Sequence, residues 1–403
     1  MDVDARIEVI RELCSFQGRL AGTDAERRAA NRLAERLRAG GRRVDVEPTY
    51  VHPQYAAVMA LHCVLGVVGS LVAVAIPALG FGLVLFAATS MYLDLNYRFY
   101  LLRRLFFRRA SQNVVSPAPG ADRPARLILT AHYDAARTGA AFAPKRARRA
   151  ARLSERHAWA GPFRPLFWSL ALLLPALGAR MAGVDSDATA IAALPFTLVL
   201  LIGTFALLDI QLSAVVPGAN DNASGVATVL SLAEELDSAP PQNLGVWVVL
   251  PGGEECLQEG MRSFVRAHRS ELDQRPAYFV NLDTVGHGGV RFQTAGGWVI
   301  SYDMDRRLAE LASAIAEADA GDGDRFRARP LAHGLAGDEM PARLAGFPAI
   351  SLGCTDADGY VPHYHLPSDT PDTVDAEALE RVHGFALELI RQLDRDLGRR
   401  GVS

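Results

Sequence analysis

Five short polar motifs contain the residues of this chain whose types and spacing could do chemistry. They are His132-Tyr133-Asp134, Asn220-Asp221-Asn222, Glu254-Glu255, Leu282-Asp283 and the segment His365-Leu366-Pro367-Ser368-Asp369-Thr370. Imidazole nitrogens and carboxylate oxygens are ligands that zinc accepts. A pair of such ions about 3.5–4 Å apart also needs a carboxylate that bridges them. The motifs therefore contain the donors that a two-zinc hydrolytic site requires.

The elements that must position these motifs can be predicted from the apolar pattern. Buried-strand runs at 126–131, 244–250 and 277–282 end directly before His132, before the glycines that lead to Glu254, and before Asp283. Further strands are predicted at 43–50 and 349–352, and helices at 25–38, 226–236 and 375–397. Strands that alternate with helices indicate an α/β fold. In such sheets, polar residues at the carboxyl ends of the strands line the site.

Each motif also has an ordinary structural explanation when it is taken alone. Asp221 could cap a helix, Glu254-Glu255 could be a solvated acidic pair, and His365 could be a surface or core histidine. Because five such features occur in one chain, and three follow predicted strands, we favour the metal site.

Two apolar regions predict membrane segments. Residues 53–93 contain no Asp, Glu, Lys or Arg, and this run is about twice the ~20 residues that cross a bilayer. Pro77, Gly80 and Gly82 interrupt it, which predicts two spans joined by a turn. A second pair is predicted at 165–179 and 188–208. The alternatives are a buried hairpin in a soluble core for the first region and an interfacial or re-entrant helix for 165–179.

The arginine distribution predicts how these spans are oriented. Basic residues follow the first apolar region and precede the second, while the predicted hairpin tips carry almost none. The positive-inside rule then places both termini and the polar domain in the cytoplasm. The alternative is that these arginines solvate a surface or bind anionic lipid headgroups.

Composition limits the remaining function classes. The 403 residues carry a net charge of −3, so nothing indicates a nucleic-acid partner. The four cysteines are scattered and include no CxxC pair, which argues against a structural zinc knuckle or a disulfide framework.

Taken together, the motifs resemble those of the co-catalytic di-zinc metallopeptidase family that includes bacterial leucyl aminopeptidases, glutamate carboxypeptidase and glutaminyl cyclase. The most specific match is the segment 218–225, Gly-Ala-Asn-Asp-Asn-Ala-Ser-Gly. The segments 18–23, 111–115, 131–134, 254–255, 281–286 and 364–370 add to it. The resemblance implies a three-layer α/β sandwich with a central mixed sheet, here interrupted by transmembrane α-hairpins.

The resemblance also implies metal ligands and a cofactor. His132 and Asp283 would hold one Zn²⁺ ion, Glu255 and His365 would hold the other, and Asp221 would bridge the two.

Four further residues receive supporting or catalytic roles from the same resemblance. Glu254 would be the general base, and Tyr364 would help to polarise the substrate carbonyl. Asp134 would fix the tautomer of His132, and Asp369 would play a similar part near His365.

Three departures from the family pattern bear on specificity. The family usually joins the first histidine to the bridging aspartate by a short loop, whereas a long insertion lies between His132 and Asp221 here. Leu257 stands where the family often has glycine, and Glu339 where it often has histidine.

The insertion constrains the topology. Because His132 and Asp221 must reach the same metal, the chain between them crosses a bilayer an even number of times or not at all. We therefore predict an integral membrane protein with four spans and a cytoplasmic catalytic domain. Its parts would be catalytic segments at 1–52, 98–140 and 213–403, a first transmembrane hairpin at 53–97, and an insertion at 141–212 that contains a basic segment and a second hairpin.

The leading functional hypothesis is a membrane-anchored zinc aminopeptidase that acts on peptides and contacts the lipid bilayer through two hairpins. The alternatives are carboxypeptidase or glutaminyl cyclase chemistry on the same metal site, or a metal-free relative without activity. A transporter is disfavoured because the predicted spans contain no Asp, Glu, Lys or Arg. Neither the side-chain preference nor the oligomeric state follows from the sequence.

Overall fold

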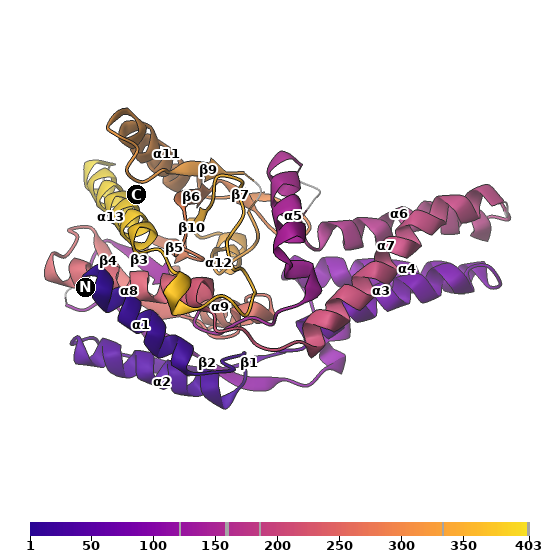
Figure 1. The fold of residues 1–403 in the computed structure, drawn as a ribbon, viewed down its shortest axis with the longest axis horizontal. Helices are drawn as coiled ribbons and strands as arrows, with labels where there is room; N and C mark the ends of the chain where they lie inside the picture. Colours follow the sequence, from indigo (N-terminus) through magenta and orange to yellow (C-terminus); the bar gives the residue numbers. More distant parts are fainter. Residues whose placement is uncertain (121, 158–160, 185–186, 333, 401–403) are drawn as a thin grey trace.

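The chain folds into an α/β domain from which a bundle of four long helices projects (Figure 1). The computed structural model describes residues 1–403 except 121, 158–160, 185–186, 333 and 401–403. Both ends of the described chain lie in the α/β domain, on the side away from the bundle.

An eight-stranded mixed sheet forms the centre of the α/β domain, in the order β1-β2-β4-β3-β5-β10-β6-β9. The strands β4, β3, β5 and β10 run parallel to one another, whereas β1, β2 and β6 join antiparallel neighbours. The strand bounds are β1 Asp45–Val51, β2 Arg109–Ser116, β3 Ala125–Thr130, β4 Leu244–Leu250, β5 Ala277–Leu282, β6 Gly289–Gln293, β9 Arg329–Leu331 and β10 Ala349–Thr355. A separate pair consists of β7 Ala295–Gly296 and β8 Tyr302–Asp303.

Helices cover both faces of the sheet. The helices α1 Val3–Ser15, α2 Asp24–Ala39, α8 Ser224–Ser238, α11 Arg306–Gly321 and α13 Ala376–Arg400 share one apolar cluster with the sheet. On the other face lie α9 Glu259–Ala267, α10 Arg269–Leu272 and α12 Glu339–Leu344. Along β3, Leu127 and Leu129 enter the first cluster and Ile128 the second, because successive side chains of a strand point to opposite faces. The predicted three-layer α/β fold is therefore confirmed.

The predicted elements agree best where the apolar pattern is continuous. The strands at 244–250 and 277–282 have the predicted bounds, and the other predicted strands and helices shift by a few residues at their ends. The strand β2 was not predicted, since its sequence Arg-Ala-Ser-Gln-Asn-Val-Val-Ser is largely polar. It forms because β1 and β4 supply backbone hydrogen-bond partners on its two sides.

The bundle consists of two helical hairpins. The first is α3 Tyr55–Val72 with α4 Pro77–Leu95, and the second is α6 Arg164–Met181 with α7 Asp187–Leu212. Small residues let the backbones of the first hairpin approach closely: a Cβ on Gly80 would lie 2.4 Å from the carbonyl oxygen of Gly69. The basic helix α5, Pro144–Arg156, comes between the two hairpins in the sequence. In space it lies beside the base of the bundle (Figure 1).

Among the described residues, α3, α4 and α7 are long and apolar enough to cross a membrane. The helix α6 has 18 residues but carries Arg164 and Arg180 near its ends, and it is not one of these three. The sequence predicted four spans. By length and composition the structure supports three.

Candidate metal centre

The five predicted motifs meet at one edge of the sheet. His132 follows β3, Glu254 and Glu255 form the short helix η5 (Glu254–Cys256) after β4, and Asp283 follows β5. Asp221 lies in the turn η4 (Ala219–Ala223) that leads into α8, and the peptide bond after it is cis. His365 comes from the loop after β10. The parallel strands end at this edge, which explains why residues far apart in the sequence converge here.

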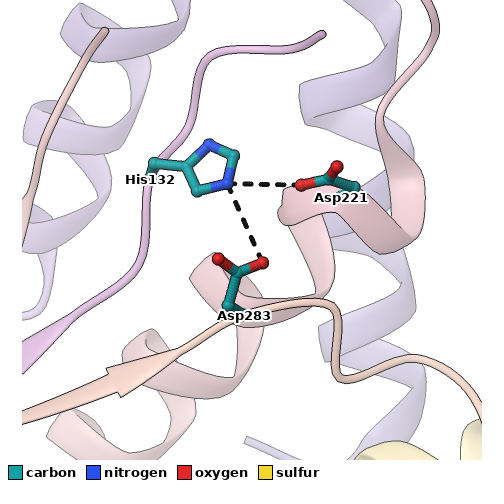
Figure 2. A group of neighbouring side chains, drawn as sticks. All are labelled: His132, Asp221 and Asp283. Atoms are coloured by element: carbon teal, nitrogen blue, oxygen red, sulfur yellow. Dashed lines mark ion pairs between the residues drawn. The ribbon is translucent and has the colours of Figure 1, made fainter. Parts of the chain in front are cut away.

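Asp221 lies between the two histidines. Its Oδ1 is 3.3 Å from Nε2 of His132, and its Oδ2 is 3.1 Å from Nε2 of His365. Figure 2 shows the His132 ring turned toward both Asp221 and Asp283. Because each carboxylate oxygen of Asp221 faces a different histidine, this side chain can bridge two ions.

Each histidine has a second carboxylate of its own. Asp283 Oδ1 is 3.9 Å from Nε2 of His132, and Glu255 Oε1 is 3.5 Å from Nε2 of His365. Ligand atoms lie within 4.8 Å of one another in the groups His132–Asp221–Asp283 and Asp221–Glu255–His365, and also in a third group, His132–Glu254–Glu255. The structure thus brings together the predicted ligands in the predicted pairs.

The chemistry of this donor set fits a pair of cations. Among the described residues, the groups that could hold a metal combine two imidazoles with four buried or half-buried carboxylates, those of Asp221, Glu254, Glu255 and Asp283. Burial, with the neighbouring carboxylates, raises the pKa of Asp283 to about 7 despite the opposing effect of His132. Both ring nitrogens of His365 and Oδ2 of Asp221 are buried and make no hydrogen bond of acceptable geometry, although Oδ2 and Nε2 lie only 3.1 Å apart. Metal ions would satisfy these atoms and offset the negative charge.

Asp134 connects two of the motifs. Its Oδ1 lies 3.4 Å from Nδ1 of His132 and accepts a hydrogen bond from the backbone N–H of Glu254 at 3.1 Å. Its Oδ2 accepts from the backbone N–H of Glu255 at 3.2 Å. One buried carboxylate therefore orients a histidine and the acidic pair together.

Asp369 supports a different residue from the one that the sequence indicated. We expected it near His365, but its two carboxylate oxygens accept hydrogen bonds from the backbone N–H groups of Asn220 and Asp221, at 2.7 and 3.1 Å. It therefore holds the bridging aspartate, and the reason is that the 365–370 loop folds back onto η4.

Aromatic rings enclose His365. The ring of Tyr364 stacks on it with centroids 4.0 Å apart, and Phe142 lies against it at 4.4 Å. Phe142 belongs to the short helix η2 (Ala140–Phe142), within the insertion between His132 and Asp221. Arg148 and Arg152 of α5 pair with Asp358, seven residues before His365. The insertion thus reaches the metal site, which its sequence did not reveal.

Gln258 is a further site residue that the sequence analysis missed. Its Nε2 donates to Oε1 of Glu254 at 2.5 Å, and the side chain is buried. The departure from the family pattern at the neighbouring Leu257 could have drawn attention to Gln258. Leu257 and Gln258 have φ values of +65° and +56°, in the left-handed region that favours glycine.

Glu339, the other departure, lies beneath the site. Its carboxylate accepts hydrogen bonds from the backbone N–H of Gly337 and from Nδ2 of Asn281, at 3.0 and 3.1 Å. It belongs to none of the three groups that could hold a metal among the described residues.

Known proteins match the part of the chain that carries most of these ligands. Residues 204–390, which include Asp221, Glu254, Glu255, Asp283 and His365, match Peptidase family M28. The predicted resemblance is confirmed. Aminopeptidase YwaD of Bacillus subtilis (strain 168) is 28% identical to this chain over 168 residues, which cover 41% of the chain and 35% of YwaD. The probable lipoprotein aminopeptidase LpqL of Mycobacterium tuberculosis is 27% identical over 191 residues, with coverages of 40% and 37%. The matches thus span about a third of each curated relative.

Solved structures share the fold of this chain. A leucine aminopeptidase precursor and a glutaminyl cyclase, both from Bacteroides thetaiotaomicron, each give a TM-score of 0.55 at 16% identity, with 97% of both chains covered. A Zn-dependent exopeptidase from Parabacteroides distasonis gives 0.55 at 14% identity, covering 97% of this chain and 99% of that one. At these identities the likeness establishes the fold.

Proposed function

We propose that this chain is a membrane-anchored di-zinc exopeptidase that hydrolyses the N-terminal peptide bond of peptides. The observation that carries the proposal is the position of Asp221, with one carboxylate oxygen toward His132 and the other toward His365. The match to Peptidase family M28 and the aminopeptidase relatives support the same reaction class.

Each residue of the site has a role in the proposed reaction. Asp221 would bridge two Zn²⁺ ions, with His132 and Asp283 on one and Glu255 and His365 on the other. Bound zinc would supply a water of lowered pKa and an electrophile for the developing oxyanion. Glu254, whose Oε2 lies 3.9 Å from Nε2 of His132, would accept a proton from the attacking water and pass it to the leaving amine. Tyr364, stacked on His365, would help to polarise the substrate carbonyl.

The apolar helices would anchor this site at a membrane. The length and composition of α3, α4 and α7 support spans, and α6 would complete the second hairpin. In this arrangement the two hairpins would be insertions into one catalytic domain, and the positive-inside rule applied to the arginines at their bases favours a cytoplasmic location for that domain.

Cleavage of a matched peptide panel tests the reaction. Detergent-purified protein is incubated with N-terminally free and N-acetylated versions of the same peptides, with and without a zinc chelator. We expect release of the N-terminal amino acid from the free peptides only, and loss of release with the chelator. Equal cleavage of the acetylated peptides, or chelator-resistant cleavage by both the wild type and Glu254→Gln, would contradict the proposal.

Glutaminyl cyclase chemistry is the alternative, since proteins of that activity share the fold. Peptides that begin with glutamine separate the two. A peptidase adds water and releases free glutamine, whereas a cyclase joins the α-amine to the side-chain carbonyl carbon and releases ammonia. Ammonia release without free glutamine would favour the cyclase.

A further inference from the structure

The base of the first hairpin lies directly against the loop that carries Glu254. Leu257 packs in the apolar cluster of the bundle, together with residues of α3 and α4. Arg103, fully buried, donates through Nε and Nη2 to the carboxylate of Asp94 at the end of α4, at 3.0 and 2.6 Å. Its Nη1 donates to the carbonyl oxygen of Cys256 at 2.9 Å. The hairpin and the loop are therefore joined by a buried, charge-assisted contact.

The amide of Gln258 has only one orientation that satisfies its neighbours. The carbonyl oxygen of Ala336, 3.0 Å away, can only accept, so the nitrogen Nε2 must face it. The indole N–H of Trp298, 3.1 Å from Oε1, can only donate. Because both ends are assigned in this way, Nε2 is the atom that donates to Oε1 of Glu254 at 2.5 Å.

Tyr97, two residues beyond the end of α4, completes the contact. Its hydroxyl donates to Oε1 of Gln258 at 2.5 Å and accepts from Nε1 of Trp298 at 3.0 Å. Its backbone carbonyl accepts from Arg262 at 2.9 Å. Burial raises the pKa of Tyr97 well above its ordinary value, so the hydroxyl remains a donor. A continuous chain of hydrogen bonds thus runs from the hairpin base to Glu254.

We propose that Tyr97 and Gln258 are positioning residues, through which the first hairpin sets the orientation of the Glu254 carboxylate. Gln258 holds Oε1, and this leaves Oε2, the oxygen nearer to His132, free to accept the proton. The hairpin is then part of the catalytic apparatus as well as an anchor. The inference rests on the proposed role of Glu254 as general base.

Single-atom and near-isosteric variants test this chain of bonds in the full-length protein. Tyr97→Phe removes only the hydroxyl, and Gln258→Met removes the amide while keeping the length. We expect each to lower kcat about ten- to a hundredfold with KM within about twofold and zinc content unchanged, because a slightly misplaced base slows the chemical step more than binding. The double variant should be no worse than the poorer single variant, since both act through one unit.

Tyr302→Phe is the matched control. The Tyr302 hydroxyl donates to Oδ1 of Asn96 at 3.0 Å in the same interface between the bundle and the α/β domain. It lies outside the chain from Tyr97 to Glu254, so we expect kcat within about twofold of the wild type. An equal loss in Tyr302→Phe and Tyr97→Phe, or wild-type kcat in Tyr97→Phe, would overturn the proposal.

Crystal structures of the zinc-loaded wild type and Gln258→Met separate failure of this inference from failure of the proposed reaction. If the wild type cleaves no peptide, the reaction is wrong, yet the structures still decide the positioning. A Glu254 carboxylate that contacts Gln258 in the wild type and is displaced in Gln258→Met supports it. An identical carboxylate position in both proteins contradicts it.

Discussion

In the α/β domain large apolar side chains are buried between the layers, whereas in the bundle many of them point outward. Ile202, Phe205 and Leu71 are 68%, 66% and 65% exposed, and they lie on α7 and α3. Contiguous exposed apolar surface is costly in water and marks a site of interaction with a protein partner, a ligand or a membrane. This difference is the one that the proposed membrane anchoring of the bundle would produce.

The polar groups of the α/β domain and of the bundle also differ, in how completely they are paired by hydrogen bonds. In the α/β domain several buried polar atoms at the strand ends have no hydrogen-bond partner, among them Oδ2 of Asp221 and both ring nitrogens of His365. In the bundle, polar side chains pair with groups of the bundle itself. Nδ1 of His62 lies 2.8 Å from the carbonyl oxygen of Val58, and its Nε2 lies 2.9 Å from the Ser90 hydroxyl. The hydroxyls of Ser70 and Thr197 lie 2.8 Å apart. Internal pairing is what a lipid environment demands, whereas unpaired polar atoms indicate a ligand site.

Of the variants considered, Glu254→Gln should have the largest effect, which is a loss of kcat. It alters the α/β domain alone. Loss of the general base should lower kcat about 10²- to 10⁴-fold, while the amide keeps the shape of the side chain. Zinc content, measured by atomic absorption, and the membrane-bound fraction should match the wild type. A variant that retains most of its activity would remove Glu254 from its proposed role.

Ile202→Arg tests the bundle. On an outward face of α7, an arginine should oppose insertion by about 2.5–3.5 kcal/mol if that face meets lipid. We expect a lower fraction of protein in carbonate-washed membranes, with Ile202→Leu as the control. If Ile202→Arg stays in the membrane as well as Ile202→Leu does, the outward apolar surface of α7 has another purpose.

The convergence of the candidate metal ligands could be predicted from the sequence for a specific reason. His132, Glu255 and Asp283 follow apolar strands, and parallel strands end at one edge, so their convergence follows from the fold class. The strand β2 was missed because its polar residues are stabilised by neighbouring strands rather than by their own pattern.

The contacts between the bundle and the α/β domain could not be predicted from the sequence. Tyr97, Gln258 and Trp298 are far apart in the sequence, and they meet only because the first hairpin docks against the loop after β4. Phe142 likewise reaches His365 only through the path of the insertion. Such contacts depend on the relative placement of whole elements, which neither periodicity nor motif spacing encodes.

Asp134→Asn should weaken zinc binding without removing a ligand. Its carboxylate contacts His132 and the backbone of Glu254 and Glu255, and loss of such an outer partner typically lowers metal affinity 10- to 100-fold. Competition with a chelator of known affinity measures the change. Asp24→Asn, an exposed carboxylate on α2, is the control and should bind zinc as the wild type does. Equal affinity in both variants would show that Asp134 does not support the site.

The smallest expected effect concerns the water-facing side of the α/β domain. Nε2 of His268 lies 2.8 Å from Oε1 of Glu47, and this contact raises the pKa of His268 above its ordinary value of 6.5. A raised folded-state pKa means that the pair stabilises the fold fully below about pH 6.5 and loses this contribution as pH rises through the folded pKa.

Glu47→Gln should therefore lower the free energy of unfolding by about 0.5–1 kcal/mol near pH 6 and by less near pH 9. Thermal unfolding in detergent at both pH values measures the difference. Glu271→Gln, which removes the longer 3.3 Å contact to Nδ1 of the same histidine, is the matched variant and should have the smaller effect. If Ile202→Leu on the bundle showed the same pH dependence, the change would be global rather than a property of this pair. The proposed separation between a titrating, water-facing domain and a bundle that faces lipid would then fail.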